Sequence, residues 1–307
     1  MWSRKFVIAV GAMAMAVALA ALPAGASATF PGRNGMLVAL FNSATRATIE
    51  GIAPGGGHHV VYSCSEDGDS CDFQIENPSV SPNGRELAFD GLVYTDSYYT
   101  QSEVTLLAIG KQSLSFVPFS SSAYSQMETA PAWIPGGKTF VFALGNENGG
   151  PVPSCDTETT IGTHVTNVIK GFCNHPDVAP DGKSLLYDTG SGLWSAGIDG
   201  SNPTLVMAHA SRPSWAPNGK RIAFVSGGAV YVSSSTGADR RRLASRGSDP
   251  VWSPNGKLVA YAILSGGGDT TRICVRPSGG GLPRLVFTKA KKSGDTFAGM
   301  DWQALGG

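Results

Sequence analysis

The sequence predicts an all-β fold, a six-bladed β-propeller of four-stranded blades, and three observations support this prediction. A segment of the form Pro-x-Trp-Ser-Pro-Asn-Gly-Lys, followed by a short apolar run, recurs in five variants along the chain. A further pair of apolar runs follows most copies, and partial copies stand near both ends. Recurrence at about 20 to 50 residues is typical of repeat architectures, and four strands per repeat are typical of a propeller blade.

Each copy predicts a strand that ends near the Trp position, then a tight turn and a second strand. Pro presets φ at the turn, while Asn, Asp and Gly tolerate the left-handed region. The turn glycines, separated by 53, 45, 37 and 37 residues, are Gly84, Gly137, Gly182, Gly219 and Gly256. The runs that follow are rich in strand-forming residues: 87–89, 140–142, 185–187, 222–224 and 258–261.

A second hairpin is expected after three of these copies, within 193–206, 230–243 and 273–287. The blade that contains the Gly137 turn, which is the third when the N-terminal half-repeat is counted as the first, is irregular, because no outer hairpin can be placed between Gly145 and Asn174. At the ends, Met300–Gln303 resembles a first strand, whereas Pro31–Gly35 and Met36–Leu40 resemble a turn and a second strand. We expect these two half-repeats to form a sixth blade and close the ring, which removes free sheet edges.

These repeats resemble the WD40-like PD40 repeat of the TolB-type six-bladed β-propellers, and the resemblance covers nearly all of residues 29–307. It implies a propeller whose Trp, Pro and Gly positions serve packing and turns. We therefore expect the Trp position to pack between adjacent sheets; it is occupied by Trp133, Trp215, Trp252 and Trp302, and by Val80 and Val178. The α/β domain that precedes the propeller in TolB has no counterpart here, so the Tol–Pal role is not carried over.

Residues 1–28 have the pattern of a signal peptide, so 29–307 is expected to be a single propeller domain. Arg4 and Lys5 precede an apolar stretch from Phe6 to Leu22, and Ala26-Ser27-Ala28 is a cleavage pattern. A membrane anchor is the competing interpretation, since the stretch approaches the length of a short spanning helix. The sequence thus predicts an exported protein, secreted or retained in the envelope or periplasm, with no transmembrane segment after cleavage.

Charge and cysteine content narrow the function classes. Residues 29–307 carry 21 basic and 23 acidic residues, which argues against a nucleic-acid partner. The one basic cluster, Arg240-Arg241-Arg242, is interpreted as a solvated strand edge, with an anion site as the alternative. Export permits disulfides, and we expect Cys64–Cys71 and Cys155–Cys173, with Cys274 a buried free thiol.

Propeller topology places the short turns on one face and the long, dissimilar connections on the other, where binding residues are expected. Two candidate sites follow on the long-connection face. One is a partner-binding set of tyrosines: Tyr94, Tyr98, Tyr99 and Tyr124. The other is a weak Ca²⁺ candidate, with a solvated acidic turn as the alternative: Glu66, Asp67, Asp69 and Asp72. No other cofactor is expected.

No sequence pattern of a catalytic centre is present. The histidines lack metal-ligand spacing, and no nucleophile elbow, phosphate loop or dinucleotide fingerprint occurs. His175 precedes a repeat proline, as do Asn77, Ala130, Arg212 and Asp249, and this position, at the entrance to an inner strand, is expected to line the central channel. The leading hypothesis is a non-enzymatic, monomeric exported propeller that binds a protein or envelope partner. The alternative is a propeller hydrolase or lyase acting on polysaccharide or peptide at the channel; a Ca²⁺-stabilised structural module is a third, weaker option.

Overall fold

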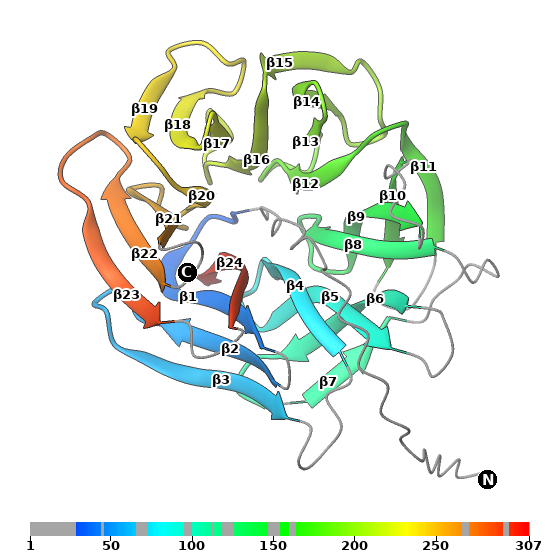
Figure 1. Ribbon diagram of the computed structural model, residues 1–307. Helices are drawn as coiled ribbons and strands as arrows, with labels where there is room; N and C mark the ends of the chain where they lie inside the picture. Colours follow the sequence, from blue (N-terminus) through cyan, green and yellow to red (C-terminus); the bar gives the residue numbers. More distant parts are fainter. Residues whose placement is uncertain are drawn as a thin grey trace, which may run out of the picture.

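The computed structural model describes residues 29–43, 46–65, 73–94, 100–111, 113–117, 126–146, 154–159, 164–265, 270–290 and 295–306. All regular elements in these ranges are β-strands, arranged as sheets around a common axis (Figure 1). The chain is therefore an all-β β-propeller. No helix among the described residues is long and apolar enough to cross a membrane. The predicted signal peptide, 1–28, lies outside the described ranges.

Five sheets each consist of four consecutive antiparallel strands within the described ranges, and each forms one blade. Their strands are β4 (Phe73–Val80), β5 (Glu86–Tyr94), β6 (Thr100–Ala108) and β7 (Ser113–Phe116); β8 (Gln126–Trp133), β9 (Thr139–Asn146), β10 (Ser154–Thr159) and β11 (His164–Lys170); β12 (Asn174–Val178), β13 (Ser184–Thr189), β14 (Gly192–Gly197) and β15 (Thr204–Ala208); β16 (Ala210–Trp215), β17 (Arg221–Ser226), β18 (Ala229–Ser234) and β19 (Arg241–Ala244); and β20 (Ser248–Trp252), β21 (Leu258–Ser265), β22 (Thr270–Pro277) and β23 (Arg284–Ala290).

Five blades in the described ranges are continuous in sequence, so the expected count of six is corrected to five such blades and one composite sheet, in which the two half-repeats pair as expected. The remaining four-stranded sheet is composite: β24 (Thr296–Leu305) pairs with β1 (Arg33–Asn42), which pairs with β2 (Arg46–Ile52) and β3 (His58–Ser65). No turn joins β24 to β1, so their hydrogen-bond ladder and the apolar packing of their side chains hold them together. The turn expected at Pro31–Gly35 is also wrong, since Arg33 and Asn34 already pair with Leu305 and Ala304.

The inner strands contact one another in ring order, from β24 to β4, β8, β12, β16, β20 and back to β24. The predicted turns after these strands are confirmed. In each blade the turn glycine has a positive φ, from +65° to +70°, and its N–H closes the turn, as in Gly84 N to Ser81 O at 2.8 Å. At Gly84 a Cβ would lie 2.1 Å from the Ala304 carbonyl oxygen, so this turn also fits closely against β24.

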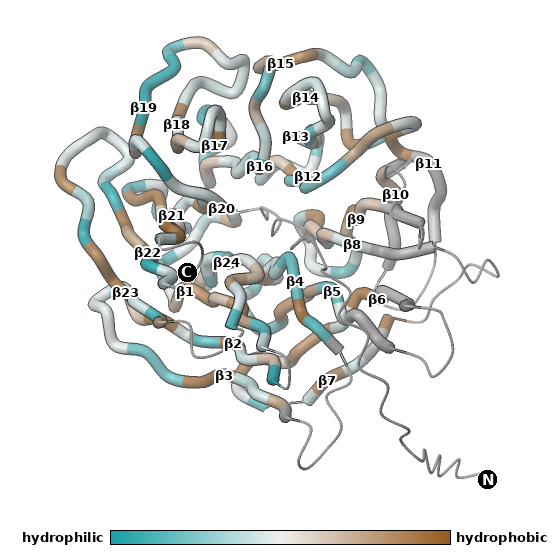
Figure 2. Tube along the Cα trace, in the orientation of Figure 1, coloured by the Kyte–Doolittle hydropathy of each residue, from teal (hydrophilic) through white to brown (hydrophobic). Residues whose placement is uncertain are grey.

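The core lies between adjacent sheets and contains the repeated tryptophans. Trp133 and Trp252 are fully buried, and Trp302 and Trp215 nearly so. Three of the four also donate their Nε1–H to a backbone carbonyl oxygen of another strand: Trp133 to Ser79 in β4, Trp215 to Asp177 in β12 and Trp302 to Gly35 in β1. The prediction that this position serves inter-sheet packing is confirmed. Figure 2 shows apolar and polar segments alternating along the strands.

The third blade has the outer hairpin that the sequence did not reveal, formed by β10 and β11. The predicted disulfide between Cys155 and Cys173 is present, and both residues are buried. It joins β10 to the segment just before β12 and so fastens this hairpin to the next blade. Cys64 is disulfide-bonded, while its predicted partner Cys71 lies outside the described residues. Cys274 is a buried free thiol, as expected, and burial raises its pKa.

Candidate functional site: the axial charged cluster

The residue before the repeat proline has an unusual backbone in all five continuous blades. Each of these residues has a φ between +45° and +54°, and the ladder between the first two strands shifts register beside it. They are Asn77, Ala130, His175, Arg212 and Asp249. A positive φ is uncommon for non-glycine residues, and a residue before proline ordinarily prefers extended backbone. In the composite sheet, Gly299 stands at the matching place with a φ of +117°.

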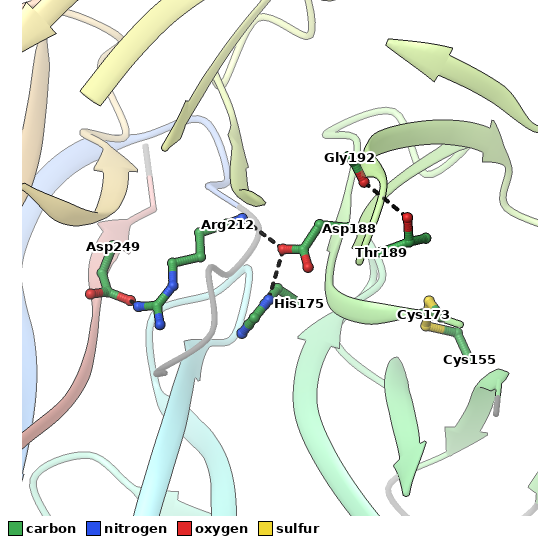
Figure 3. Close-up of polar contacts among 8 residues, drawn as sticks. All are labelled: Cys155, Cys173, His175, Asp188, Thr189, Gly192, Arg212 and Asp249. Atoms are coloured by element: carbon green, nitrogen blue, oxygen red, sulfur yellow. Dashed lines mark hydrogen bonds and ion pairs between the residues drawn. A yellow bond between two sulfur atoms is a disulfide. The ribbon is translucent and has the colours of Figure 1, made fainter. Parts of the chain in front are cut away.

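This backbone places chemically distinct side chains where the inner strands begin, around the axis. His175 Nδ1 lies 2.7 Å from Asp188 Oδ2, and the same oxygen accepts the backbone N–H of Arg212 at 2.7 Å. The Arg212 guanidinium forms an ion pair with Asp249 of the following blade. Three consecutive blades are thereby connected by charged contacts (Figure 3). The His175 and Arg212 side chains keep 13% and 12% of their surface exposed, so the cluster reaches solvent.

The same arrangement recurs in an earlier pair of blades. Asp90 occupies the position in β5 that Asp188 occupies in β13. Its carboxylate accepts a hydrogen bond from the Asn77 side-chain amide of its own blade. It also accepts the backbone N–H of Ala130, in the next blade, at 2.8 Å. Burial raises the pKa of Asp90 well above its ordinary value, and the hydrogen bond from Asn77 opposes this only in part.

Glu76 is the member of the cluster without a bond to the scaffold. Among the described residues its carboxyl group makes no hydrogen bond and no ion pair. Burial raises its pKa to about 7, and the positive charge of Arg212 lowers it in part. Because β4 and β16 lie opposite each other in the ring of inner strands, this electrostatic interaction crosses the axis. We call Glu76, Asp90, His175, Asp188, Arg212 and Asp249 the axial cluster.

A second layer lies deeper along the inner strands and is fully buried. Asp301 accepts the Val80 N–H at 2.6 Å, and Asp177 accepts the Trp215 N–H, so each carboxylate connects adjacent inner strands. Ser79 and Ser214 accept the equivalent N–H groups of Trp133 and Trp252. Burial raises the pKa of Asp177, and the negative charge of Asp301 adds to it. This layer joins the blades and has no access to solvent.

The structure places the predicted site residues as follows. Tyr94 ends β5, but its side chain lies outside the described set, as do Tyr98, Tyr99 and Tyr124 entirely. All four members of the Ca²⁺ candidate, Glu66, Asp67, Asp69 and Asp72, also lie outside the described residues. Within the described ranges, no group of three or more His, Cys, Asp or Glu side chains is arranged to hold a metal ion.

The sequence predicted His175 near the channel, and the structure confirms its place at the start of an inner strand. Arg212 and Asp249 share the repeat position of His175 and were expected there too, whereas Glu76, Asp90 and Asp188 were missed. A signal was available for two of these, because the second apolar run is followed directly by Asp in two copies, Phe89-Asp90 and Tyr187-Asp188.

Comparisons with known proteins identify the fold. No sequence-family model matches the chain, and no curated protein matches it in sequence. Among solved structures, TolB from Acinetobacter baumannii superposes with a TM-score of 0.65 at 17% identity, covering 88% of this chain and 67% of TolB. The tricorn protease gives 0.55 at 15% identity, with 84% and 27% covered. A puromycin-hydrolyzing peptidase of Mycobacterium tuberculosis gives 0.53 at 13%, with 89% and 57% covered.

At these identities the similarity establishes the fold class and nothing finer. The chain is a β-propeller similar to those of TolB and of two peptidases. It spans little more than half of the peptidase and about a quarter of the tricorn protease, so the similarity is confined to part of those enzymes. Their activities are therefore not assigned to this chain on the strength of the fold.

Proposed function

We propose that this chain is an exported, non-enzymatic β-propeller that binds a protein or cell-envelope partner through the face on which the axial cluster opens. The observation that carries the proposal is the convergence of Glu76, His175 and Arg212 at the solvent-reaching end of the inner strands. By propeller topology this end belongs to the long-connection face, where binding residues concentrate. The Cys155–Cys173 disulfide supports export, since such bonds persist in oxidising compartments.

Binding is favoured over catalysis because most of the cluster is committed to the scaffold. Asp90 and Asp188 each accept a backbone N–H from the next blade, and Asp249 neutralises Arg212. These contacts fix the side chains on rigid strands, as a recognition site requires. Among the described residues, Glu76 is the one carboxyl group of the cluster that makes no hydrogen bond or ion pair to the scaffold. It can therefore accept a hydrogen bond from a ligand, and the ligand's charge would shift its protonation.

The test is capture of partners from the native envelope fraction by chemical cross-linking, comparing the wild type with Glu76→Gln. This substitution keeps the side-chain size and removes no hydrogen bond of the scaffold. Lys183→Gln is the matched control, because Lys183 is exposed on a turn of the opposite face. We expect Glu76→Gln to lose the specific cross-linked species and Lys183→Gln to retain it. Recovery of the same species with all three proteins would exclude the axial face as the contact.

A second function, that of a hydrolase or lyase acting on polysaccharide or peptide at the axis, is favoured by one specific observation. Burial raises the pKa of Glu76 to about 7, and the positive charge of Arg212 acts on the same carboxyl group. A carboxyl group that titrates near neutral pH suits general acid–base catalysis. Initial rates on peptide and polysaccharide substrate panels, for the wild type and Glu76→Gln, test it. A turnover abolished by Glu76→Gln would establish catalysis, and equal background rates would reject it.

A further inference from the structure

The chain is neutral overall but its charge is unevenly distributed. Residues 220–290 contain eleven lysines and arginines against three aspartates, whereas the whole chain holds 23 of each sign. This segment spans most of the last two continuous blades, β17 to β23. Figure 2 colours β19 strongly hydrophilic at the outer rim. A basic excess concentrated in adjacent blades creates a local field that attracts anions, although the chain as a whole is not basic.

Three arginines of this segment meet at the boundary between the two blades. Arg221 and Arg241, from the starts of β17 and β19, both donate to the carbonyl oxygen of Ser278, in the turn after β22. Arg276, near the end of β22, donates to the Gly281 carbonyl at 2.6 Å and reaches back to the Leu243 carbonyl in β19. We call Arg221, Arg241 and Arg276 the arginine cluster.

The arginine cluster has no carboxylate partner among the described residues. None of its three guanidinium groups forms an ion pair within the part of the chain that the structure describes. Asp239, in the turn before β19, is exposed and makes no ion pair there either; Asp249, at the other end of β20, is paired with Arg212. The proximity of Arg221 and Arg241 is itself unfavourable, and it contributes to lowering the pKa of Arg221 after partial burial.

A neighbouring turn adds the positive charge of Lys257 to the arginine cluster, and the three guanidinium groups keep N–H donors that their carbonyl contacts do not use. Ser278 donates its N–H to the Lys257 carbonyl and its hydroxyl to the Gly256 carbonyl, so the turn that bears exposed Lys257 lies against the cluster. Gly280, with a φ of +108°, packs so closely that a Cβ would lie 3.0 Å from Arg241 Nη1. A guanidinium group has more N–H donors than these carbonyl contacts use, and the carbonyls fix its orientation.

We infer that the arginine cluster, with Lys257 beside it, is a binding site for a phosphate group. Guanidinium groups held in a fixed orientation without a counterion bind phosphate by paired, charge-assisted hydrogen bonds. The site lies on the face of the short turns, at the opposite end of the strands from the axial cluster, so it does not rest on the function proposed above. The phosphate can be free or can belong to an anionic lipid headgroup, and the experiment separates the two sources.

The experiment uses the mature chain at neutral pH and constant ionic strength. Its melting temperature is followed as sodium phosphate replaces sodium chloride, for the wild type, Arg241→Gln and Arg272→Gln. Arg272 is the matched control: it is exposed, lies on β22 toward the opposite face, and its loss removes the same charge. Flotation with phosphatidylcholine vesicles, with and without phosphatidylglycerol, then tests the lipid source. Arg241→Lys, which keeps the charge but not the planar fork, separates a general field from directed hydrogen bonds.

We expect phosphate to stabilise the wild type in a saturable manner and Arg241→Gln to weaken its binding by about tenfold or more, whereas Arg272→Gln leaves it unchanged. Arg241→Lys should fall between them. Flotation that depends on phosphatidylglycerol and on Arg241 assigns the lipid source, and its absence assigns free phosphate. Phosphate that stabilises no more than chloride, or an equal loss in Arg272→Gln, overturns the inference. If Arg241→Gln fails to fold, Lys257→Gln provides the same comparison without breaking an inter-blade contact.

Discussion

Asp188 Oδ2 accepts the backbone N–H of Arg212 at 2.7 Å, and this contact crosses from one blade to the next. The same oxygen lies 2.7 Å from His175 Nδ1, so a single carboxylate carries one contact within its blade and one between blades. Asp90 makes the equivalent two contacts with separate oxygens, Oδ2 to Asn77 in its own blade and Oδ1 to Ala130 in the next. The residues that shape the axial cluster are therefore also residues that hold adjacent blades together, and substitutions there affect stability as well as binding.

Asp188→Ala should destabilise the fold by about 2 to 3 kcal/mol, because it leaves the Arg212 N–H without its charged acceptor. Asp188→Asn should cost less, since the amide oxygen still accepts that hydrogen bond. Urea denaturation of the two variants measures the difference. Asp239→Asn is the control: Asp239 is exposed, makes no ion pair among the described residues, and has a φ of +53°, which asparagine tolerates. Equal midpoints for Asp188→Ala and Asp239→Asn would contradict the proposed connection between blades.

Glu76 should make stability depend on pH in a defined direction. Its pKa is raised from 4.5 to about 7 in the folded chain, so the folded state retains the proton longer than the unfolded state. Below about pH 4.5 both states are protonated and the preference for the folded state is complete. As pH rises toward 7 this stabilisation is lost, by an amount on the order of 3 kcal/mol.

Glu76→Gln removes this titration and also the negative charge that helps to raise the pKa of Asp90, whereas the raised pKa of Asp177 has other causes and is common to both proteins. We expect the variant to gain stability relative to the wild type between about pH 5 and about pH 8, when unfolding free energies are compared at the two values. Parallel pH profiles for the two proteins would show that Glu76 is ionised at its ordinary pKa in the folded chain.

The sequence predicted the parts of the blades that depend on neighbouring residues, namely the tight turns and the apolar strands beside them. Each Pro-Asn-Gly or Pro-Asp-Gly turn needs a left-handed glycine, and Gly182 and Gly256 adopt that conformation with the strands on both sides. The hairpin of β10 and β11 was missed because it lacks such a turn signal, although the disulfide that fastens it, Cys155–Cys173, was predicted. The interpretation of Pro31–Gly35 as a turn failed because the same residue types also fit a strand that pairs with β24.

The axial cluster was harder to predict, since it depends on distances between blades. His175 was placed near the channel from its position before a repeat proline. Its partner Asp188 stands at the end of a second strand, where the sequence shows only the end of an apolar run. The interaction of Glu76 with Arg212 joins opposite sides of the ring, and no sequence pattern records which blades face each other.

Two tryptophans at the same repeat position should respond differently to replacement by phenylalanine. Trp215 donates its Nε1–H to the Asp177 carbonyl, whereas the buried Nε1–H of Trp252 has no hydrogen-bond acceptor among the described residues. Trp215→Phe loses a hydrogen bond and ring volume, for a cost of about 2 to 4 kcal/mol. Trp252→Phe should cost at least about 1 kcal/mol less, because it removes an unsatisfied donor. Chemical denaturation of the pair checks this, and a larger loss for Trp252→Phe would refute it.

The turn glycines provide a second matched pair. At Gly219, with a φ of +67°, a Cβ would have no atom of the described residues within 4 Å, whereas at Gly84, with a φ of +70°, it would lie 2.1 Å from the Ala304 carbonyl oxygen. Gly219→Ala should cost only the backbone strain, about 1 to 2 kcal/mol. Gly84→Ala adds a clash with β24 and should cost roughly 3 kcal/mol or more. Differential scanning calorimetry of both variants distinguishes them, and equal losses would show that β24 moves freely away from this turn.

The Cys155–Cys173 disulfide should contribute to the stability of the third blade. It closes a loop with a sequence separation of 18 residues, for which the constraint on the unfolded chain is worth about 3 kcal/mol. The double variant Cys155→Ala and Cys173→Ala should therefore unfold at lower denaturant and expose the hairpin of β10 and β11 to protease before the other blades. Cys274→Ala, which removes a buried free thiol from a different blade, is the control. Uniform proteolysis across all blades in the double variant would show that the disulfide stabilises the ring as a whole instead of fastening this hairpin.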